Sequence, residues 1–238
     1  MTASPRPPLV DIRGLRYTWP GQEAPCLEIE GFRLEPGEAV LLHGPSGSGK
    51  STLLSLIGGV LTPQAGEVAV LGRSLGSLGG PARDRWRADH VGFIFQLFNL
   101  LPYLSVEDNI LLPCRFSRRR RERIAAAGRR PHAEAKRLAA HLDLPADLLG
   151  RKAANLSVGQ QQRVAAARAL IGQPELVIAD EPTSALDADR QQAFLDLLAR
   201  ECAEAGAGLL FVSHDLRLGE HFGRVLHLAD LNTAGGRQ

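Results

Sequence analysis

The sequence predicts an α/β protein with a mostly parallel sheet, an antiparallel β portion near the N-terminus and an inserted helical portion. Three observations indicate this. Short apolar runs of buried-strand length alternate with segments of helical periodicity along much of the chain. Segments of alternating polarity, typical of antiparallel strands, precede them between Val10 and about Glu35. A mainly helical pattern from Gln96 to about Leu156 interrupts the alternation.

Size and composition suit one globular domain or a domain with an insertion. The chain has 238 residues, of which 44% are hydrophobic and 23% charged, so it can bury a full core. A net charge of +2 is too small to indicate a polyanionic partner. Cys26, Cys114 and Cys202 lie far apart without metal-ligand spacing. Their placement favours a reducing compartment over a disulfide framework or a zinc site.

The N-terminal stretch MTASPRPP has no apolar segment after a basic region, so no secretory signal is expected. No apolar run approaches the ~18–20 residues that a membrane helix needs. We therefore expect a cytoplasmic protein. Residues 1–8, which are rich in proline, and residues 233–238 are expected to be disordered tails.

The first part of the chain is expected to be mostly strands. The segments VDIRGLRYTW and LEIEGFRLE have the alternation of antiparallel strands, and EAVLLHG is a buried strand that ends in glycine. A glycine-rich loop follows, and helical periodicity begins at Lys50. GEVAVLG and HVGFIF are two further strands. Together they predict a strand–loop–helix unit within a larger sheet.

The second part is expected to contain a helical insertion and then the rest of the sheet. SVEDNILLP opens on a Ser105/Asp108 pair that resembles a capping box. ELVIAD and LLFVSHD are buried strands separated by the helix ADRQQAFLDLLARECAEAG, and RVLHLAD closes the fold. We expect one core domain made of residues 9–95 and 164–232, with a helical subdomain at 96–163 between its two parts.

The stretch GPSGSGKST fits the phosphate-binding pattern GxxxxGK[ST] between a strand and a helix. Its glycines let successive amides point at phosphate oxygens, and the helix N-terminus adds a favourable dipole. Lys50 is expected to reach the β- and γ-phosphates, and Ser51 to bind Mg²⁺. The alternative is a glycine-rich turn without a ligand. The candidate nucleotide-binding residues are Gly44, Pro45, Ser46, Gly47, Ser48, Gly49, Lys50, Ser51 and Thr52.

LVIADEPT brings two carboxylates to the carboxyl end of a strand, where an open α/β sheet binds ligands. Asp180 is expected to hold the Mg²⁺ hydration shell, and Glu181 is the candidate general base for water attack on the γ-phosphorus. His214, after the strand LLFVS, and Gln96, after VGFIF, would contact phosphate, water or Mg²⁺. Taken alone, each of these residues is more typical of a strand end or a packed side chain.

The ordered set GPSGSGKST, VGFIFQ, LSVGQQQR, LVIADEPTSALD and FVSHD resembles the nucleotide-binding domain of ABC transporters, from about Val10 to Asp230. The resemblance implies a P-loop NTPase fold with a RecA-like core. It implies that Gln96 is the Q-loop glutamine and a metal contact, that Ser184 and Asp187 form the D-loop, and that His214 is the switch histidine.

An aromatic side chain stacks on adenine in this family, and LRYTWPG offers Tyr17 and Trp19. Both point to one face of a strand because they alternate with Arg16 and Thr18. Trp19, which precedes Pro-Gly, is the preferred candidate. The alternative is that both rings are edge-strand packing residues.

The segment NLSVGQQQR matches the family's signature, whose serine and glycine amides bind the γ-phosphate of ATP held by the opposite subunit. Ser157, Val158, Gly159 and Gln160 are the residues carried over. One chain has one P-loop and one signature, so the resemblance implies a homodimer around two ATP molecules. Val158 stands where the family has glycine, and a β-branched residue disfavours φ > 0. We therefore expect helical or extended dihedrals at that position.

The resemblance also implies an integral membrane permease as partner. QLFNLLPYLSVEDNI is expected either to pack within the helical insertion or to line a groove for a permease helix, and it resembles, more narrowly, ATPases of lipoprotein-releasing and macrolide-exporting systems. The run RRRRER at 118–123 is expected to be a solvated helix face, with lipid or permease contact and nonspecific nucleic-acid contact as alternatives. No specific nucleic-acid partner is expected.

We therefore expect an ATPase subunit, with ATP and Mg²⁺, that is peripheral on the cytoplasmic face of the inner membrane through its permease. Two other classes remain open. One is a soluble ABC-type ATPase of DNA repair or translation, although the long insertions or tandem domains of those proteins are missing from this sequence. The other is a P-loop small-molecule kinase, which would have no signature. The sequence does not indicate the transported substrate, because specificity in such systems lies in the permease, and import, export and mechanotransmission all stay open.

Overall fold

A computed structural model describes residues 7–184 and 186–234, so most of the two expected tails lie outside the described residues. Its central sheet has five strands that run parallel to their neighbours. Their order is β6 (Val91–Ile94), β7 (Leu176–Asp180), β8 (Gly208–Ser213), β3 (Ala39–His43) and β9 (Arg224–His227). The first four in this order were predicted as strands, and β9 lies in the segment RVLHLAD that was expected to close the fold. The parallel arrangement confirms the α/β class.

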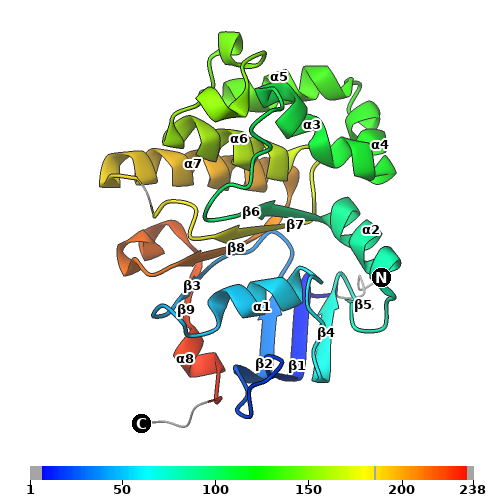
Figure 1. The fold of residues 1–238 in the computed structure, drawn as a ribbon, viewed down its shortest axis with the longest axis vertical. Helices are drawn as coiled ribbons and strands as arrows, with labels where there is room; N and C mark the ends of the chain where they lie inside the picture. The colour runs from blue at the N-terminus through cyan, green and yellow to red at the C-terminus, as the bar shows by residue number, and fades with distance from the viewer. Residues whose placement is uncertain (1–6, 185, 235–238) are drawn as a thin grey trace, which may run out of the picture.

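A second, antiparallel sheet comes mainly from the N-terminal part of the chain. Its order is β2 (Leu27–Leu34), β1 (Val10–Tyr17), β4 (Ala65–Val70) and β5 (Arg73–Ser74). Apolar side chains of this sheet, of the parallel sheet and of α1 (Lys50–Ile57) form one buried cluster. The helix that follows the glycine loop is therefore fixed by apolar packing on strands of both sheets (Figure 1).

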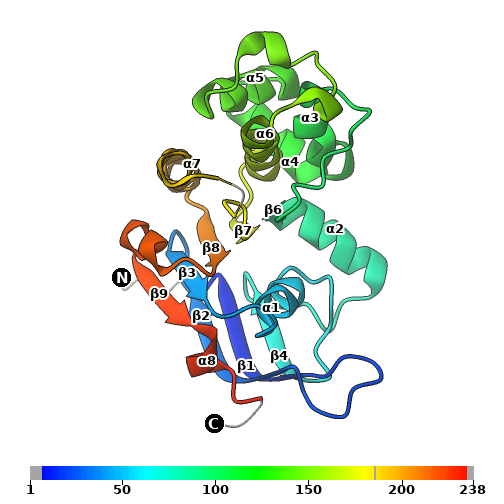
Figure 2. The same ribbon diagram turned by 60° about the vertical axis from the view of Figure 1, so that its left-hand side comes forward.

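Most of the remaining helices lie on the other side of the parallel sheet (Figure 2). They are α3 (Val106–Phe116), α4 (Arg118–Ala126), α5 (Pro131–His141), α6 (Val158–Leu170) and α7 (Ala188–Ala205), with 3-10 turns η1 (Ala146–Leu148) and η2 (Ala153–Asn155). A second buried cluster joins them to the parallel sheet. The α6 helix crosses the expected boundary at 163/164 without a break.

The sequence did not predict α2 (Gly80–His90), because GPARDRWRADH buries only Trp86 and has no apolar period. The last helical elements of the described residues are the 3-10 turn η3 (Leu216–His221) and α8 (Leu228–Leu231). Across residues 7–184 and 186–234, none of the helices has both the length and the apolar character needed to cross a membrane.

Most of the arginine run on α4 is exposed, as expected of a solvated helix face, but Arg120 is not. Arg120 is only 1% exposed, and its guanidinium donates to the backbone carbonyls of Ala88, Val91, Ala169 and Ile171 at 2.6–3.1 Å. Burial lowers the pKa of Arg120 to about 10, so the side chain stays charged near neutrality. The carbonyls of Ala88 and Ala169 belong to the last turns of α2 and α6, where a cation is favoured by the helix dipole.

The other arginines of the run also find partners inside the chain. Arg118 pairs with Glu122 at 2.6 Å, and Arg121 donates to the Cys114 carbonyl. Arg119 and Arg123 both pair with Glu175, the residue before β7. The run therefore anchors α4 to its surroundings, which favours a structural role over nucleic-acid contact.

Candidate active site

The P-loop joins β3 to α1 and has a backbone that only glycine adopts easily at two positions. Gly47 has φ +78° and Gly49 has φ +102°. A Cβ at Gly49 would also lie 2.9 Å from Leu27 Cδ2. The curled loop places its amides around the N-terminus of α1, as phosphate binding requires.

Lys50, the first residue of α1, points back into this loop. It is 6% exposed, and its Nζ donates to the carbonyls of Gly44 at 2.7 Å and Pro45 at 2.9 Å. The same nitrogen lies 3.6 Å from Glu181 Oε1. Ser48 Oγ is buried without a hydrogen-bond partner among the described residues. The loop thus holds a buried cation and an unpaired hydroxyl, and both suit an anionic ligand.

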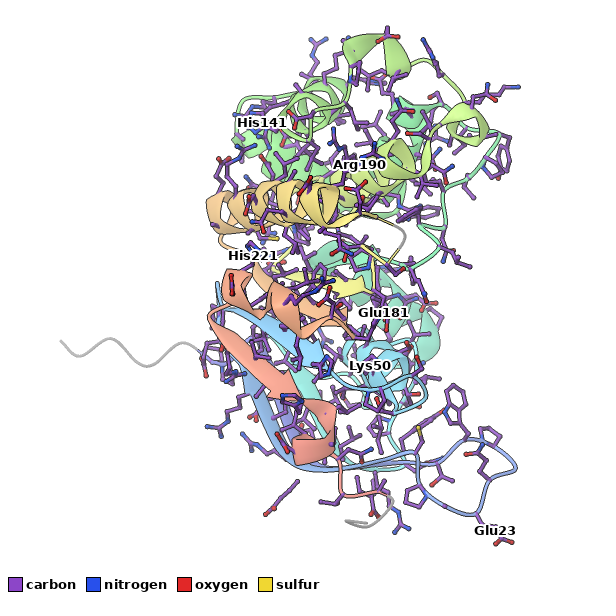
Figure 3. All side chains as sticks on the ribbon, turned by 90° about the vertical axis from the view of Figure 1, so that its left-hand side faces the viewer. Glu23, Lys50, His141, Glu181, Arg190 and His221 are labelled. Atoms are coloured by element: carbon purple, nitrogen blue, oxygen red, sulfur yellow. The ribbon has the colours of Figure 1, made fainter. Side chains whose placement is uncertain are left out.

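Two acidic residues end β7 beside the loop. Burial raises the pKa of Asp180, while a hydrogen bond from Ser51 and the charge of Lys50 partly oppose this. Glu181 Oε2 lies 3.2 Å from His214 Nδ1, just after β8. Figure 3 shows Lys50, at the start of α1, and Glu181, just after β7, near each other. One carboxylate therefore lies between a lysine and a histidine.

A cavity of about 500 Å³ collects residues from distant segments: Trp19, Gln22, Cys26, Ser46, Gly47, Gly49, Lys50, Ser51, Thr52, Gln96, Asp180 and Glu181. Trp19 is 39% exposed there, whereas Tyr17 is 6% exposed behind it, with the two rings 5.3 Å apart and edge-on. This geometry favours Trp19 as the stacking residue. No pattern in the sequence pointed to Gln22 and Cys26, which reach the cavity through the loop between β1 and β2.

The signature forms the start of α6 and lies outside that cavity. Ser157 Oγ accepts from the Gln160 amide at 3.3 Å, and Gln160 Oε1 accepts from the Ser157 amide at 3.0 Å, which completes a capping box. Val158 is the first helical residue, has no positive φ and is 47% exposed. The expectation of ordinary dihedrals at Val158 is confirmed. These residues line a separate cavity of about 400 Å³.

The expected D-loop residues, Ser184 and Asp187, lie between β7, which ends at the P-loop cavity, and α7. Ser184 N donates to the Glu181 carbonyl at 3.3 Å. Asp187 caps α7 by accepting from the Arg190 amide at 3.0 Å. Ala185, between them, lies outside the described residues. The segment after Glu181 thus leads directly into α7.

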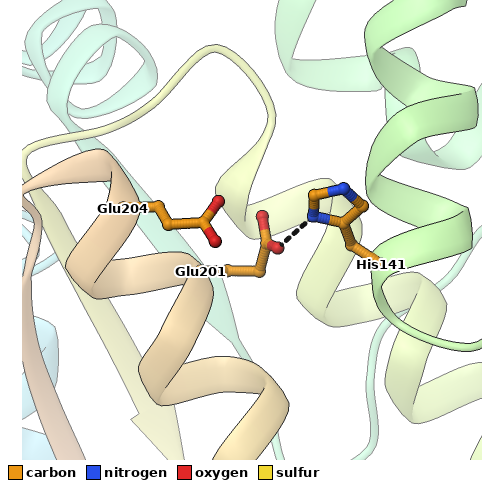
Figure 4. Close-up of side chains that lie close together, drawn as sticks. All are labelled: His141, Glu201 and Glu204. Atoms are coloured by element: carbon orange, nitrogen blue, oxygen red, sulfur yellow. Dashed lines mark hydrogen bonds and ion pairs between the residues drawn. The ribbon is translucent and has the colours of Figure 1, made fainter.

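A further titratable cluster lies away from this site, between α5 and α7. His141 Nδ1 is 2.7 Å from Glu201 Oε1, and Glu204 is close by (Figure 4). Arg137 lies 3.5 Å from Glu201 and 3.0 Å from His141. Because Arg137 already supplies the positive charge that a metal ion would bring, the cluster is an ion-pair network joining the two helices rather than a metal site.

Comparison with known proteins shows the family to which the chain belongs. The family model described as "ABC transporter" matches residues 28–184. The chain is 40% identical over 207 residues to the lipoprotein-releasing system ATP-binding protein LolD of Pseudomonas fluorescens, with 85% of this chain and 86% of LolD covered. It is 38% identical over 223 residues to the macrolide export ATP-binding/permease protein MacB of Rhodopseudomonas palustris. That match covers 93% of this chain but only 33% of MacB.

Among solved structures, a dimeric bacterial ABC transporter cassette matches with a TM-score of 0.80 and 31% identity, over 92% of this chain and 93% of that one. A post-hydrolysis dimer bound to ADP and Pi matches equally well in TM-score, at 32% identity. The narrower resemblance to lipoprotein-releasing and macrolide-exporting ATPases is confirmed by the names of the relatives. The chain belongs to the ABC transporter family and is one of its ATPase cassettes.

Proposed function

We propose that the cavity at the P-loop binds Mg-ATP and that Glu181 is the base in its hydrolysis. The convergence of Lys50, Gln96, Asp180 and Glu181 on one cavity carries this proposal. The Ser51 hydroxyl and the Asp180 carboxylate line the same cavity and are hard oxygen ligands of the kind Mg²⁺ prefers. When bound, Mg²⁺ would neutralise charge on the β- and γ-phosphates.

The side chains around Glu181 suit its role. Lys50 at 3.6 Å and His214 at 3.2 Å lie on its two carboxylate oxygens. A water between Glu181 and the γ-phosphorus would lose its proton to the carboxylate as it attacks. Lys50 would move onto the phosphates, and His214 would hydrogen-bond to phosphate or to the attacking water. Trp19 would stack on the adenine ring.

We further propose that two copies of the chain complete each ATP site. Gly159 supports this, because a Cβ built there meets nothing within 4 Å in its own chain and its φ is not positive. The chain itself therefore does not require glycine at 159, whereas close approach of a partner or ligand does. Ser157 accepts a hydrogen bond within its own helix, so its hydroxyl proton remains available for a phosphate of the partner-bound ATP.

The test of the catalytic proposal is Glu181→Gln. The variant keeps the shape of the side chain but cannot accept a proton, so we expect ATP-dependent dimers with turnover reduced by about a hundredfold or more. Gel filtration with ATP and phosphate release measure the two properties. Turnover close to that of the wild type would remove Glu181 as the base.

We propose a permease as the membrane partner. MacB supports this, because its name joins an ATP-binding part to a permease and this chain matches only a third of its length. A groove of about 600 Å³ between α2, α3 and β6 includes Phe93, Leu112 and Phe116, and Phe116 is 70% exposed. Of the segment after Gln96, Phe98 packs in the core while Tyr103 is 67% exposed. A cytoplasmic segment of the permease would cover the groove.

Phe116→Gln tests the docking surface. We expect the variant to lose co-purification with an integral membrane protein while keeping its ATPase activity, because a polar side chain in the groove weakens apolar contact. Val60→Gln is the matched control, since Val60 is 52% exposed and outside the groove. Equal recovery of membrane protein with wild type and both variants would exclude this groove.

A further inference from the structure

The backbone at Glu181 is strained. Its φ is +45°, in the left-handed region that non-glycine residues seldom occupy. The next residue is Pro182, and a proline pushes the residue before it toward extended dihedrals. Such a conformation persists only where the surroundings hold it. The position of the proposed base therefore depends on what fixes residues 181–184 and Leu186.

Backbone and side-chain hydrogen bonds from three elements hold this segment. The Glu181 amide donates to the Val212 carbonyl of β8 at 3.0 Å. Gln191 of α7 donates from Nε2 to the carbonyls of Thr183 and Leu186 at 3.1 and 3.2 Å. Gln162 of α6 donates from Nε2 to the Pro182 carbonyl at 3.1 Å. A side chain of α6, the helix that begins with the signature, thus donates a hydrogen bond to the carbonyl of Pro182, the residue directly after Glu181.

Gln162 is well placed to transmit a displacement. It is 1% exposed, so its amide has little freedom to exchange partners. It lies in the same continuous helix as Ser157, the N-cap residue, and that helix packs on α3 and β6. Because a packed helix moves as a unit, a shift of the signature displaces Gln162 and, with it, the Pro182 carbonyl.

We propose that Gln162 is a positioning residue that couples the two half-sites carried by one chain. It links the helix that contacts the partner's ATP to the segment that carries the base for the chain's own ATP. Engagement of the signature by nucleotide would thereby fix Glu181 for attack at the other site. The inference rests on the proposed dimer, in which each signature faces the partner's nucleotide.

The first experiment compares Gln162→Met with Gln161→Met. Methionine has a similar length but cannot donate to Pro182. Gln161 is the matched control, because it is the neighbouring glutamine on α6 and donates instead to the Leu156 carbonyl. We expect Gln162→Met to form ATP-dependent dimers with an unchanged KM and a kcat reduced by about ten- to a hundredfold. Gln161→Met should keep a near wild-type kcat. Gln162→Asn, which keeps the amide but is too short, should match Gln162→Met and replaces it if methionine prevents folding.

Mixed dimers separate a positioning role from a defect in the signature. Each test chain is paired with a Glu181→Gln chain. In such a mixed dimer only the test chain has a base, so only the ATP bound by the test chain can be cleaved. The signature at that site comes from the Glu181→Gln chain, in which Gln162 is intact. We expect single-turnover cleavage of ATP to be slow with Gln162→Met and normal with wild type. Equal rates would overturn the inference, because Gln162 would then act only at the partner's ATP site, through the signature of its own chain. Absence of ATP-dependent dimers in the wild type would instead contradict the proposed function.

Discussion

A valine stands in the signature where the ABC family has glycine, and the structure explains why the chain accepts it. Val158 begins α6 with ordinary dihedrals, and its side chain is 47% exposed rather than pressed against its own chain. The helix N-terminus and the capping box of Ser157 and Gln160 stay intact beside it. In the proposed dimer, any effect of the valine on turnover would therefore arise where the exposed side chain meets the second copy.

Val158→Gly tests this account. We expect ATPase activity to stay within about twofold of the wild type, because the backbone at 158 already has helical dihedrals. Loss of helix propensity should lower the unfolding free energy by no more than about 1 kcal/mol. Val158→Ala is the control, since it shortens the side chain without adding backbone freedom. A large gain in both variants would show that the bulk of the valine slows turnover, and a gain in glycine alone would implicate the backbone.

Single residues also mark the limit of what the sequence predicts. Motif spacing was sufficient to predict Lys50, Asp180 and Glu181 as neighbours, since strand ends of one parallel sheet meet at one edge. The sequence motif ranked Trp19 above Tyr17 but could not predict that Tyr17 is buried and Trp19 exposed, because this difference arises from the packing of β1 and β2. Gln162 gave no separate signal, since its partner is the carbonyl of Pro182, 20 residues away.

At the scale of elements, polar contacts decide how α4 is attached. Glu175, which precedes β7, lies 3.1 Å from His90 Nδ1 and 2.8 Å from Arg119, and it also pairs with Arg123. Burial alone would raise the pKa of Glu175, but these partners lower it from 4.5 to about 2. A carboxyl whose folded pKa is depressed stabilises the fold above its unfolded pKa, and that contribution is lost as the pH falls toward the folded value.

Glu175→Gln should therefore destabilise the protein at pH 7, and the difference from wild type should shrink as the pH falls from about 4.5 toward 2. Urea unfolding at several pH values measures it. Glu122→Gln is the matched control, because Glu122 pairs with Arg118 on the surface and such pairs contribute only about 0–1 kcal/mol. A difference between Glu175→Gln and wild type that does not depend on pH would contradict the assignment.

Helices and strands with a clear periodic pattern of apolar residues were predicted well, and those held mainly by polar contacts were not. The strands of the parallel sheet and the helices α1, α3 and α7 follow apolar patterns that the sequence displays directly. The α2 helix has a single buried apolar residue, Trp86. The sequence did not predict the burial of Arg120 either, because a run of like charges is usually a solvated helix face.

At the scale of the whole molecule, the P-loop residues and the signature residues of one chain lie in separate cavities, which is why we propose that each ATP site is completed by a second copy. The P-loop cavity contains Lys50 and Glu181, whereas Ser157 and Gly159 line another cavity. The comparison structures at a TM-score of 0.80 are dimers. The sequence implied this arrangement only through the family resemblance, since nothing in the residue pattern of one chain specifies how two chains meet.

The most direct test of shared sites is complementation between Lys50→Ala and Ser157→Arg. The first variant has an intact signature and a disabled P-loop, and the second has the reverse. Alone, each should fail to cleave bound ATP in a single turnover. Mixed in equal amounts, they should regain about a quarter of wild-type cleavage, because half of the dimers are mixed and each has one complete site. Cleavage that stays at background in the mixture would contradict the account, because no site would then be shared between chains.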